Sequence, residues 1–338
     1  MKLLKYLIFF LLIVFIGLAI YIAVQPNSFE VKRTRTIEAP ASVIYNNVID
    51  FKNWEAWSSW VEKDPKTVIT LDEQTKDIGG SYSWVDQDGN GRMKTIDATE
   101  NVSIDQELQF GDSEPSNIHW SFSSTPDGKT EVIWKMNSEK IPFMFKAYAA
   151  FTGGFDTMIG PDFERGLEKL DSIVVASMKI YSVNVIGLTQ HGGGFYLYNT
   201  SSCKIDDLKE KMQTMLPQVI NYGMSNNTMA GPPFVIYHKW DEENNAVMFS
   251  CCIPTTAQVI TTESDILTGQ LEPFKAVKTI LKGDFEYLQE AWNSSFKYIE
   301  TNNLIPKEIG PMIEVYVTDP SLNPNPADWI TEIYIAVE

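Results

Sequence analysis

Residues 231–237 read GPPFVIY, and the chain repeats this segment 79 residues later as GPMIEVY at residues 310–316. Each copy stands between a helical pattern and a further strand pattern. A β-α-β-β unit therefore occurs twice in the second half of the chain, and its helices need an antiparallel sheet on which to bury their apolar faces. The repeat predicts an α+β fold for residues 179–338.

The other elements of this half are placed around the repeat. Strands are expected at 181–188, 233–240, 246–253, 274–282, 312–319 and 330–337, and helices at 204–221 and 284–302. Asp284 is the expected N-cap of the second helix. The apolar spacing predicts a buried stripe on that helix, made of Phe285, Leu288, Trp292, Phe296 and Ile299. Residues 191–194 (HGGG) are similar to an esterase oxyanion loop, but no G-x-S-x-G segment accompanies them, and we expect a flexible loop.

The second copy of the repeat carries a carboxylate, Glu314, where the first copy has Val235. Side chains alternate along a strand, so Ile313 and Val315 share one face and Glu314 lies on the other, together with Met312 and Tyr316. We expect the helices to cover the all-apolar Ile313 face, which leaves Glu314 on the open face.

The last strand repeats this chemistry, because Glu332 and Tyr334 alternate with Ile333 and Ile335. A carboxylate among aromatic rings can bind a cation, and burial would raise its pKa and suit it to general acid or base catalysis. The alternative is a pair of solvent-exposed glutamates on an open sheet face, which is common in antiparallel sheets. The pattern alone leaves both interpretations open.

Residues 29–178 show a different order of patterns. A strand at 29–37 is followed by a helix that starts after Pro40, and six strands are expected near 66–73, 79–86, 91–99, 104–111, 117–124 and 130–138. Residues 155–178 form a long helix, because apolar residues recur there at spacings of three and four. Its stripe comprises Phe155, Ile159, Phe163, Leu167, Leu170, Val174 and Met178.

This first half resembles the SRPBCC superfamily (polyketide cyclase/START-like), which has a helix-grip fold. The likeness rests on residues 37–45 (IEAPASVIY), on residues 50–57 (DFKNWEAW), on Gly79-Gly80 at the start of a strand and on the closing helix. It implies a deep cavity between sheet and helix that takes up an apolar ligand, and it does not imply an enzyme. We expect Trp54, Trp57 and Trp60 to pack in the core rather than to rim a ligand entrance.

The second half resembles the GyrI-like domain, the effector-binding module of AraC- and MerR-type regulators. The likeness rests on residues 230–237, residues 283–292, Glu314-Val315-Tyr316 and residues 331–335 (TEIYI). It implies that Glu314 meets cationic aromatic ligands and that Glu332 and Tyr334 add pocket contacts. Phe285 stands where the family often has Tyr. We therefore expect a ligand-binding site formed by Tyr237, Trp292, Glu314, Tyr316, Glu332 and Tyr334.

The same resemblance leaves an enzyme as the alternative. Some GyrI-like relatives hydrolyse reactive, cyclopropane-bearing genotoxins with a Glu and aromatic hydroxyls. In this chain Glu314 and Tyr316 are the candidates for such a hydrolase, with Tyr237 or Tyr334 as further hydroxyls. The leading hypothesis is a binding protein without catalytic residues.

Residues 7–24 (LIFFLLIVFIGLAIYIAV) carry no charge, and residues 3–24 are long enough to cross a bilayer. A cleaved signal peptide is the alternative, but the apolar run is long and lacks an A-x-A-like site. We expect a single-pass membrane anchor. Lys2 and Lys5 precede the span and Lys32, Arg33 and Arg35 follow it, so the positive-inside rule is close to balanced. Because a short basic head before a first span usually stays in the cytoplasm, we expect extracytoplasmic domains.

The formal net charge of −17 excludes a basic nucleic-acid-binding face, and no nucleic-acid partner is expected. Three Cys and three His residues stand without metal-ligand spacing, so neither a metal nor another cofactor is expected. Asp86, Asp88 and Asn90 resemble the start of a calcium loop, but Asp97 stands where that loop needs a Glu, and a hairpin is expected.

The sequence thus predicts three parts: an anchor and linker at 1–28, a helix-grip domain at 29–178 and a GyrI-like domain at 179–338. The predicted function is small-molecule binding at a membrane. An apolar ligand would occupy the first domain and an aromatic or cationic ligand the second, while protein partners are not predicted.

Overall fold

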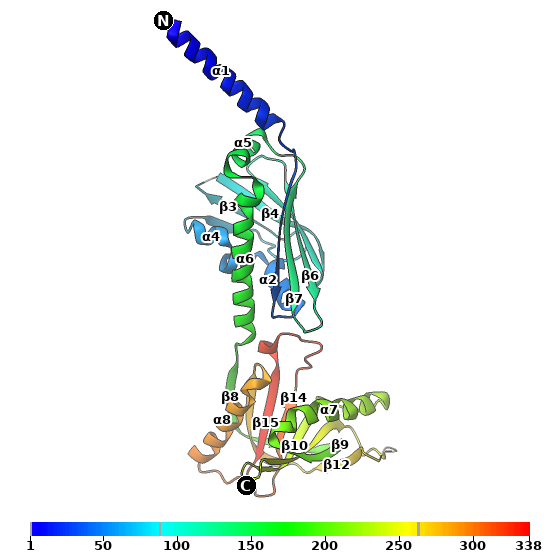
Figure 1. Ribbon diagram of the computed structural model, residues 1–338. Helices are drawn as coiled ribbons and strands as arrows, with labels where there is room; N and C mark the ends of the chain where they lie inside the picture. The colour runs from blue at the N-terminus through cyan, green and yellow to red at the C-terminus, as the bar shows by residue number, and fades with distance from the viewer. Residues whose placement is uncertain (1, 88, 262–263) are drawn as a thin grey trace. The chain divides into compact units, whose positions relative to one another are not determined.

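The computed structural model describes residues 2–87, 89–261 and 264–338. The chain divides into two compact units, Met1–Ser177 and Met178–Glu338. Each unit combines an antiparallel sheet with helices, which confirms the predicted α+β fold. The first unit begins with the apolar helix α1 (Lys2–Ala23), which is drawn in dark blue in Figure 1.

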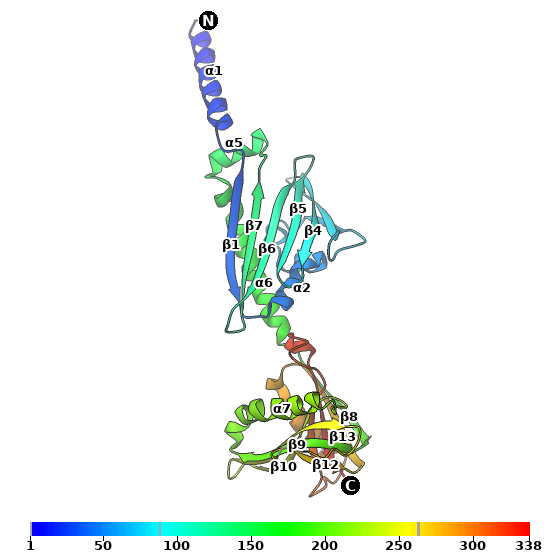
Figure 2. The same cartoon turned by 90° about the vertical axis from the view of Figure 1, so that its right-hand side faces the viewer.

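The first unit contains a seven-stranded sheet in the order β1-β7-β6-β5-β4-β3-β2. Its strands form close to their predicted positions. They are β1 (Phe29–Ile37), β2 (Val68–Leu71), β3 (Ser81–Asp86), β4 (Gly89–Thr99), β5 (Ser103–Phe110), β6 (Ser116–Ser124) and β7 (Thr130–Ser138). Figure 2 shows β1, β7, β6, β5 and β4 side by side. The segment expected to form a hairpin rather than a calcium loop joins β3 to β4; Asp88 lies outside the described residues.

Helices cover one face of this sheet. They are α2 (Ala41–Ile49), η1 (Phe51–Asn53), α3 (Trp54–Trp57), α4 (Ser59–Lys63) and the long α6 (Phe155–Met178), while α5 (Phe143–Thr152) packs against α1. The predicted stripe on α6 is fully buried only in its middle, at Phe163, Leu167, Leu170 and Val174. The sequence analysis did not predict α5, because its sequence FMFKAYAAFT is apolar at almost every position and so shows no period.

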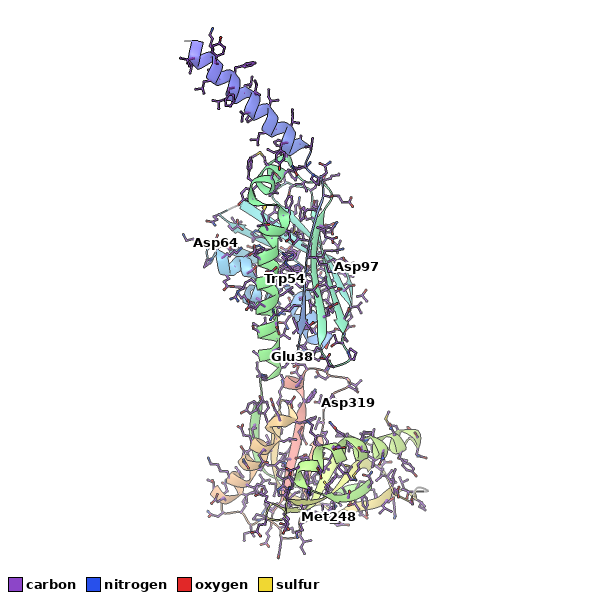
Figure 3. All side chains as sticks on the ribbon, viewed as in Figure 1. Glu38, Trp54, Asp64, Asp97, Met248 and Asp319 are labelled. Carbon is purple, nitrogen blue, oxygen red and sulfur yellow. The ribbon has the colours of Figure 1, made fainter. Side chains whose placement is uncertain are left out.

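Indole rings fill the space between α6 and the sheet. Trp120 and Trp134 stack with ring centroids 4.3 Å apart, and Phe163 of α6 stacks on Trp134 at 3.9 Å. Trp54 and Trp57 are 2% and 0% exposed, which confirms that these two pack in the core; Trp54 is labelled in Figure 3. Trp60 is only partly buried and lies edge-on to Trp134 at 5.7 Å. Stacked aromatic rings therefore occupy the space between α6 and the sheet, and aliphatic side chains such as Ile44 and Leu170 complete the core of the first unit.

The second unit contains an eight-stranded sheet in the order β12-β9-β11-β10-β14-β15-β13-β8. Its strands are β8 (Ser182–His191), β9 (Gly194–Cys203), β10 (Phe234–Asp241), β11 (Ala246–Thr255), β12 (Leu267–Leu271), β13 (Phe274–Lys282), β14 (Met312–Tyr316) and β15 (Ile330–Ala336). Its helices are η2 (Ile205–Asp207), α7 (Leu208–Ser225), η3 (Phe285–Tyr287), α8 (Leu288–Thr301) and η4 (Pro326–Asp328). Asp284 caps η3, which leads into α8.

The two β-α-β-β units are present, but the first begins one strand later than predicted. Its opening strand is β9, and residues 182–191 form β8, which lies outside the repeat at the sheet edge. β9 begins at Gly194 and β13 at Phe274, a separation of 80 residues, within one residue of the 79-residue sequence period. The central strands β10 and β14 pair antiparallel and join the units into one sheet.

Residues 191–194 were expected to form a flexible loop, and this prediction is wrong. β8 runs to His191 and β9 starts at Gly194, so only Gly192 and Gly193 connect them. Similarly, only two residues connect β12 to β13. Since β8 and β13 lie at one end of the strand order and β9 and β12 at the other, the sheet must bend until its ends meet.

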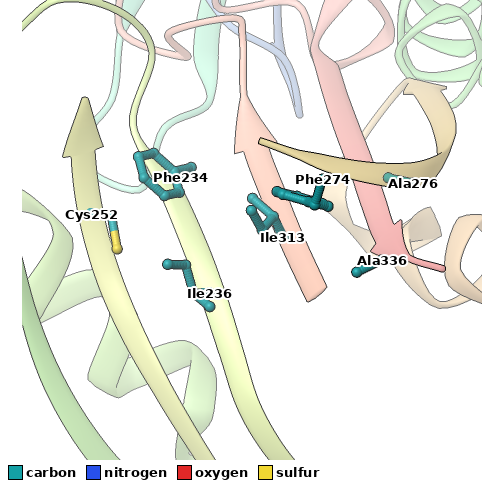
Figure 4. Packing of buried hydrophobic residues seen from close by; sticks show 7 residues of the cluster. All are labelled: Phe234, Ile236, Cys252, Phe274, Ala276, Ile313 and Ala336. Carbon is teal, nitrogen blue, oxygen red and sulfur yellow. The ribbon is translucent and has the colours of Figure 1, made fainter. Parts of the chain in front are cut away.

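The bend decides which face each helix covers. The inner face of the bent sheet holds a cluster without helical residues, shown in Figure 4: Phe234, Ile236, Cys252, Phe274, Ala276, Ile313 and Ala336. The two long helices pack on the other face, α7 against β9 and β11 and α8 against β8, β13 and β15. The prediction that the helices cover the Ile313 face is therefore wrong, because the sheet itself covers Ile313.

Candidate functional site

Glu314 occupies the centre of the helix-covered face. It lies in the middle of β14, between Val235 of β10 and Ile333 of β15 in the strand register. Directly opposed residues in a sheet point to the same side, so Val235, Glu314 and Ile333 all face the helices. The carboxylate is 3% exposed.

Three aromatic side chains donate hydrogen bonds to this carboxylate. The Tyr237 and Tyr316 hydroxyls lie 2.9 Å and 2.7 Å from Glu314 Oε2. The Trp292 indole Nε1 lies 2.5 Å from Glu314 Oε1. Tyr237 comes from β10, Tyr316 from β14 and Trp292 from α8, so both copies of the repeat supply a tyrosine at the same motif position. Among the described residues, the salt bridges of the chain do not include Glu314.

Burial governs the ionisation of this group. It raises the pKa of Glu314, and the hydrogen bonds from Trp292, Tyr316 and Tyr237 act in the opposite direction because they stabilise the charged form. Burial, followed by the charge of Glu314, holds the pKa values of Tyr237 and Tyr316 well above the ordinary tyrosine value. Both hydroxyls therefore keep their protons at neutral pH and remain donors.

A second ring of aromatic side chains surrounds these three donors. Trp240 lies edge-on to Tyr237 at 5.7 Å, Phe296 stacks on Trp292 at 6.0 Å, and Phe285 lies edge-on to Tyr316 at 5.5 Å. Met215 of α7 and Met312 belong to the same apolar cluster. Aromatic faces and thioethers suit a flat, apolar ligand, and ring faces also attract cations.

The α8 residues differ in part from the predicted stripe. Ala291, Ser295 and Ile299 are the buried positions, whereas Phe296 is 44% exposed and extends the aromatic surface beside Trp292. The sequence periodicity predicted that the largest apolar side chains of α8 would be buried. Small side chains are buried instead, because α8 lies close to the sheet, where Ser295 Oγ donates a hydrogen bond to Thr279 Oγ1 of β13 at 2.7 Å.

Glu332 and Tyr334 lie on the opposite face of the sheet from Glu314. Glu332 is opposite Val315 and Tyr334 is opposite Ile313 in the register. Glu332 Oε1 already has a cation partner, Lys278 Nζ at 2.7 Å, and Tyr334 donates to Glu332 Oε2 at 2.6 Å. The structure thus brings together Tyr237, Trp292, Glu314 and Tyr316, and separates Glu332 and Tyr334 from them.

Thr331 is a residue of this face that the sequence analysis missed. It is opposite Tyr316 in the register and fully buried, and its hydroxyl has no hydrogen-bond partner within the described part of the chain. Strand alternation assigns Thr331 to this site only after the structure has shown which face of the sheet Glu314 lies on. Lys278 was also missed, because nothing in the sequence marks its pairing with Glu332.

Two further observations concern other regions. A hollow of about 760 Å³ opens beside β9 and α7, next to Asn199 and Gln218, and Glu314 is not among the residues that line it.

In the first unit, Trp57 Nε1 and Trp134 Nε1 are buried without hydrogen-bond partners in the described residues. Across residues 2–87, 89–261 and 264–338, no three His, Cys, Asp or Glu side chains are grouped to hold a metal ion.

Comparisons with known proteins agree with this architecture. Residues 194–338 match the family described as GyrI-like small molecule binding domain, and residues 37–167 match the polyketide cyclase / dehydrase and lipid transport family. The fold and these matches define a protein with two domains, each of which belongs to a family that binds small molecules. More particularly, the chain carries an SRPBCC-like polyketide cyclase domain followed by a GyrI-like domain, which confirms both predicted resemblances.

Solved structures share low sequence identity with the chain. The crystal structure of the EcmrR C-terminal domain is 18% identical, with a TM-score of 0.39, over 47% of this chain and 98% of that one. The cryo-EM structure of an EcmrR–DNA complex is 16% identical, with a TM-score of 0.39, over 64% and 88%. A protein of unknown function from Staphylococcus aureus is 16% identical, with a TM-score of 0.36, over 46% and 98%. No curated protein matches the chain.

Proposed function

We propose that this protein is a membrane-anchored small-molecule-binding protein whose GyrI-like domain binds an aromatic cation at Glu314. The observation that carries the proposal is a buried carboxylate held by aromatic donors, with no ion-pair partner among the described residues. Burying a carboxylate without a counter-charge is unfavourable. A bound organic cation would supply that charge, and the surrounding rings would cover its flat faces.

Binding requires the site to open. Glu314 and Tyr237 are only 3% and 6% exposed, whereas the outer ring of aromatics includes the exposed Phe296 and Trp240. Trp292 stacks on Phe296 and donates to Glu314, so a rotation of its indole would uncover the carboxylate and leave a ring face for the ligand. The unpartnered Thr331 hydroxyl on the same face offers a further polar contact.

The test compares a cation with its neutral counterpart. N-methylacridinium and uncharged acridine have nearly the same shape, so calorimetric titration of both at about pH 8 isolates the effect of charge. We expect Glu314→Gln to weaken N-methylacridinium binding about 10- to 100-fold, because each 1.4 kcal/mol of lost attraction is tenfold in affinity, and to leave acridine binding nearly unchanged.

Two matched variants complete this experiment. Glu300→Gln removes an exposed carboxylate from the same α8 helix that carries Trp292 and should bind like the wild type. Glu332→Gln tests the opposite face, where Lys278 already neutralises the carboxylate, and a smaller effect than that of Glu314→Gln is expected. Equal binding of the cation by wild type and Glu314→Gln would contradict the proposed site.

The hydrolase alternative rests on the same residues. Glu314 with a raised pKa beside the Tyr316 hydroxyl has the groups that general acid–base catalysis uses, but no comparison supports hydrolysis at this site. Turnover of a cyclopropane-bearing substrate by wild type, lost in Glu314→Gln while ligand binding is retained, would favour the hydrolase over the binding protein.

For the first domain we propose an apolar ligand that carries a hydrogen-bond acceptor. The polyketide cyclase and lipid transport family supports the apolar ligand, and the unpartnered Trp57 and Trp134 indole nitrogens support the acceptor. Because the rings of Trp120, Trp134 and Phe163 stack in this space, such a ligand must displace them.

A brominated fatty acid tests this second site, because bromine quenches indole fluorescence on contact. Dibromostearate should quench the wild type, and part of that quenching should disappear in Trp134→Phe, which retains the ring stacking. Trp84→Phe, which alters a partly exposed indole of β3, is the control. Identical quenching of Trp134→Phe and wild type would contradict a ligand at the stacked rings.

The membrane anchor completes the proposal. Residues Leu3–Ala23 of α1 form a helix that is long and apolar enough to cross a membrane, although a signal sequence passes the same test. We propose an uncleaved anchor, residues 1–28, followed by domains at 29–178 and 179–338 on the extracytoplasmic side. The length of the apolar run and the two lysines before it support this arrangement.

A further inference from the structure

The α5 helix presents an apolar surface that a water-facing helix does not normally carry. Five of its ten residues are large, apolar or aromatic, and between 43% and 75% exposed: Phe143, Met144, Phe145, Tyr148 and Phe151. Its single charged residue, Lys146, is only 7% exposed and points inward. An exposed apolar patch of this kind marks a surface that contacts something other than water.

The position of α5 within the first unit identifies what that surface contacts. α5 packs against α1, and the Lys146 ammonium donates to the Gln25 carbonyl at 3.3 Å and to the Asn27 side-chain oxygen. The Ile141 backbone N–H donates to the Asn27 carbonyl at 3.2 Å. These bonds hold α5 at residues 25–27, immediately after the apolar segment of α1 ends.

Ile22 gives an independent sign that this junction is ordered. It is 5% exposed, whereas most apolar residues of α1 are exposed. Phe29 then stacks on Phe155 with ring centroids 4.2 Å apart, which joins the first residue of β1 to the first residue of α6. The end of α1, the start of β1, and the helices α5 and α6 therefore meet at one end of the first unit (Figure 1).

We propose that α5 is a membrane-surface helix, which lies in the headgroup region of the bilayer that α1 spans. The inference rests on the proposed anchor, because the bilayer surface then lies at residues 25–27, where α5 is held. Phe, Tyr and Met side chains are suited to the boundary between headgroups and acyl chains, and helices of this type bury their apolar face about 5–10 Å deep.

Continuity with α1 favours a lipid surface over a second copy of the chain, since both apolar surfaces begin at one junction. With two attachments, the first domain would be held at a constant orientation to the bilayer.

The test measures membrane depth in the full-length protein, reconstituted in phosphatidylcholine/phosphatidylglycerol vesicles. Cys203 is replaced by Ser, whereas Cys251 and Cys252 are fully buried and remain. An environment-sensitive fluorophore is attached in turn to Met144→Cys and Phe151→Cys in α5. Doxyl groups at a shallow or a deep acyl position then quench the label according to its depth.

We expect both α5 labels to be quenched more strongly by the shallow doxyl lipid than by the deep one. A label at Leu12→Cys in α1 should show the reverse preference and reports the anchor independently. A label at Val102→Cys, an apolar position that is 53% exposed in the turn between β4 and β5, is the matched control and should not be quenched.

The outcomes separate the α5 proposal from the anchor. Quenching at Leu12 without quenching at Met144 and Phe151 overturns the α5 proposal and leaves the anchor intact. Quenching at neither helix overturns both, and quenching at α5 alone supports the surface helix without a span. Emission that shifts to the blue at α5 without lipid quenching overturns the proposal in favour of a protein partner.

A second variant tests the apolar contacts directly. Tyr148→Glu with Phe151→Glu places two charges on the exposed face of α5 and should abolish lipid quenching at Met144 while quenching at Leu12 persists. Val102→Glu serves as its control, and both proteins should keep the wild-type circular dichroism spectrum because the altered side chains are exposed. Quenching at Met144 that survives both charges would overturn the proposal.

Discussion

At the scale of the residue, the proposed ligand binding of the second domain depends on the carboxylate of Glu314. Glutamate is a common residue, but the position of Glu314 is unusual, because it lies in the middle of a central strand that α8 covers. Strand alternation already placed Tyr316, two residues along β14, on the same face as Glu314. Tyr237 of β10 and Trp292 of α8 are distant in sequence, and the fold brings them to the carboxylate.

Cation binding should depend on pH through this residue. Burial raises the pKa of Glu314, so at acid pH the carboxyl keeps a proton that a cation must displace. Affinity for N-methylacridinium should rise as the pH increases through this raised pKa and then level off. Titrations between about pH 4.5 and 8 check this, and Glu314→Gln should show a flat profile.

Stability should change with pH in the opposite direction. The folded protein holds the Glu314 proton more tightly than the unfolded chain does, so this group contributes most at low pH and its contribution falls as the pH rises through the raised pKa. The difference in unfolding temperature between wild type and Glu314→Gln should therefore shift against the wild type from acid to neutral pH. Scanning calorimetry of both proteins at matched pH values measures it, and a constant difference would contradict the raised pKa.

At the scale of the element, the bend of the second sheet is the feature that the sequence did not reveal. Most strands were predicted close to their observed positions, but β9 and β12 were not. β9 follows a glycine run and has four apolar or aromatic residues in succession, Phe195 to Tyr198, before a polar segment, and the glycines suggested a loop. The bend also reversed the predicted facing of β14, because a sheet that curves onto itself buries an apolar face without helices.

Gly193 should be essential to this bend, and its neighbour Gly192 should not. Gly193 has φ of +68°, and a Cβ atom there would lie 2.2 Å from the Leu271 carbonyl oxygen, whereas a Cβ at Gly192 would meet nothing within 4 Å. Gly193→Ala should destabilise the second domain by about 3 kcal/mol, from backbone strain and overlap. Gly192→Ala should change its stability by less than about 0.5 kcal/mol. Scanning calorimetry of the two variants makes this comparison, and equal melting of both would contradict the close approach.

At the scale of the whole molecule, the chain joins an apolar helix to two small-molecule-binding families. The proposed anchor makes the full-length protein an integral membrane protein. It should remain in the membrane fraction after high salt and alkaline carbonate, and detergent should release it. Peptide mapping of the purified protein should recover the apolar segment of residues 3–24. A mature N-terminus near residue 24 would instead identify a signal peptide.

The sequence alone determined the classes of element, the two families and the separation of the chain into an apolar helix and two α+β halves. The classes of element and the separation follow from local periodicity and from letters that repeat at 79 residues, and the two families follow from the resemblance of short motifs. All of these can be read without knowing which distant residues are in contact. Only the tertiary structure decided that Tyr237, Trp292, Glu314 and Tyr316 come together while Glu332 and Tyr334 face away. The physical reason is that strand alternation defines two faces without saying which is covered. That choice depends on the bend of the sheet and on the close packing of α8, which are set by contacts between residues far apart in the chain.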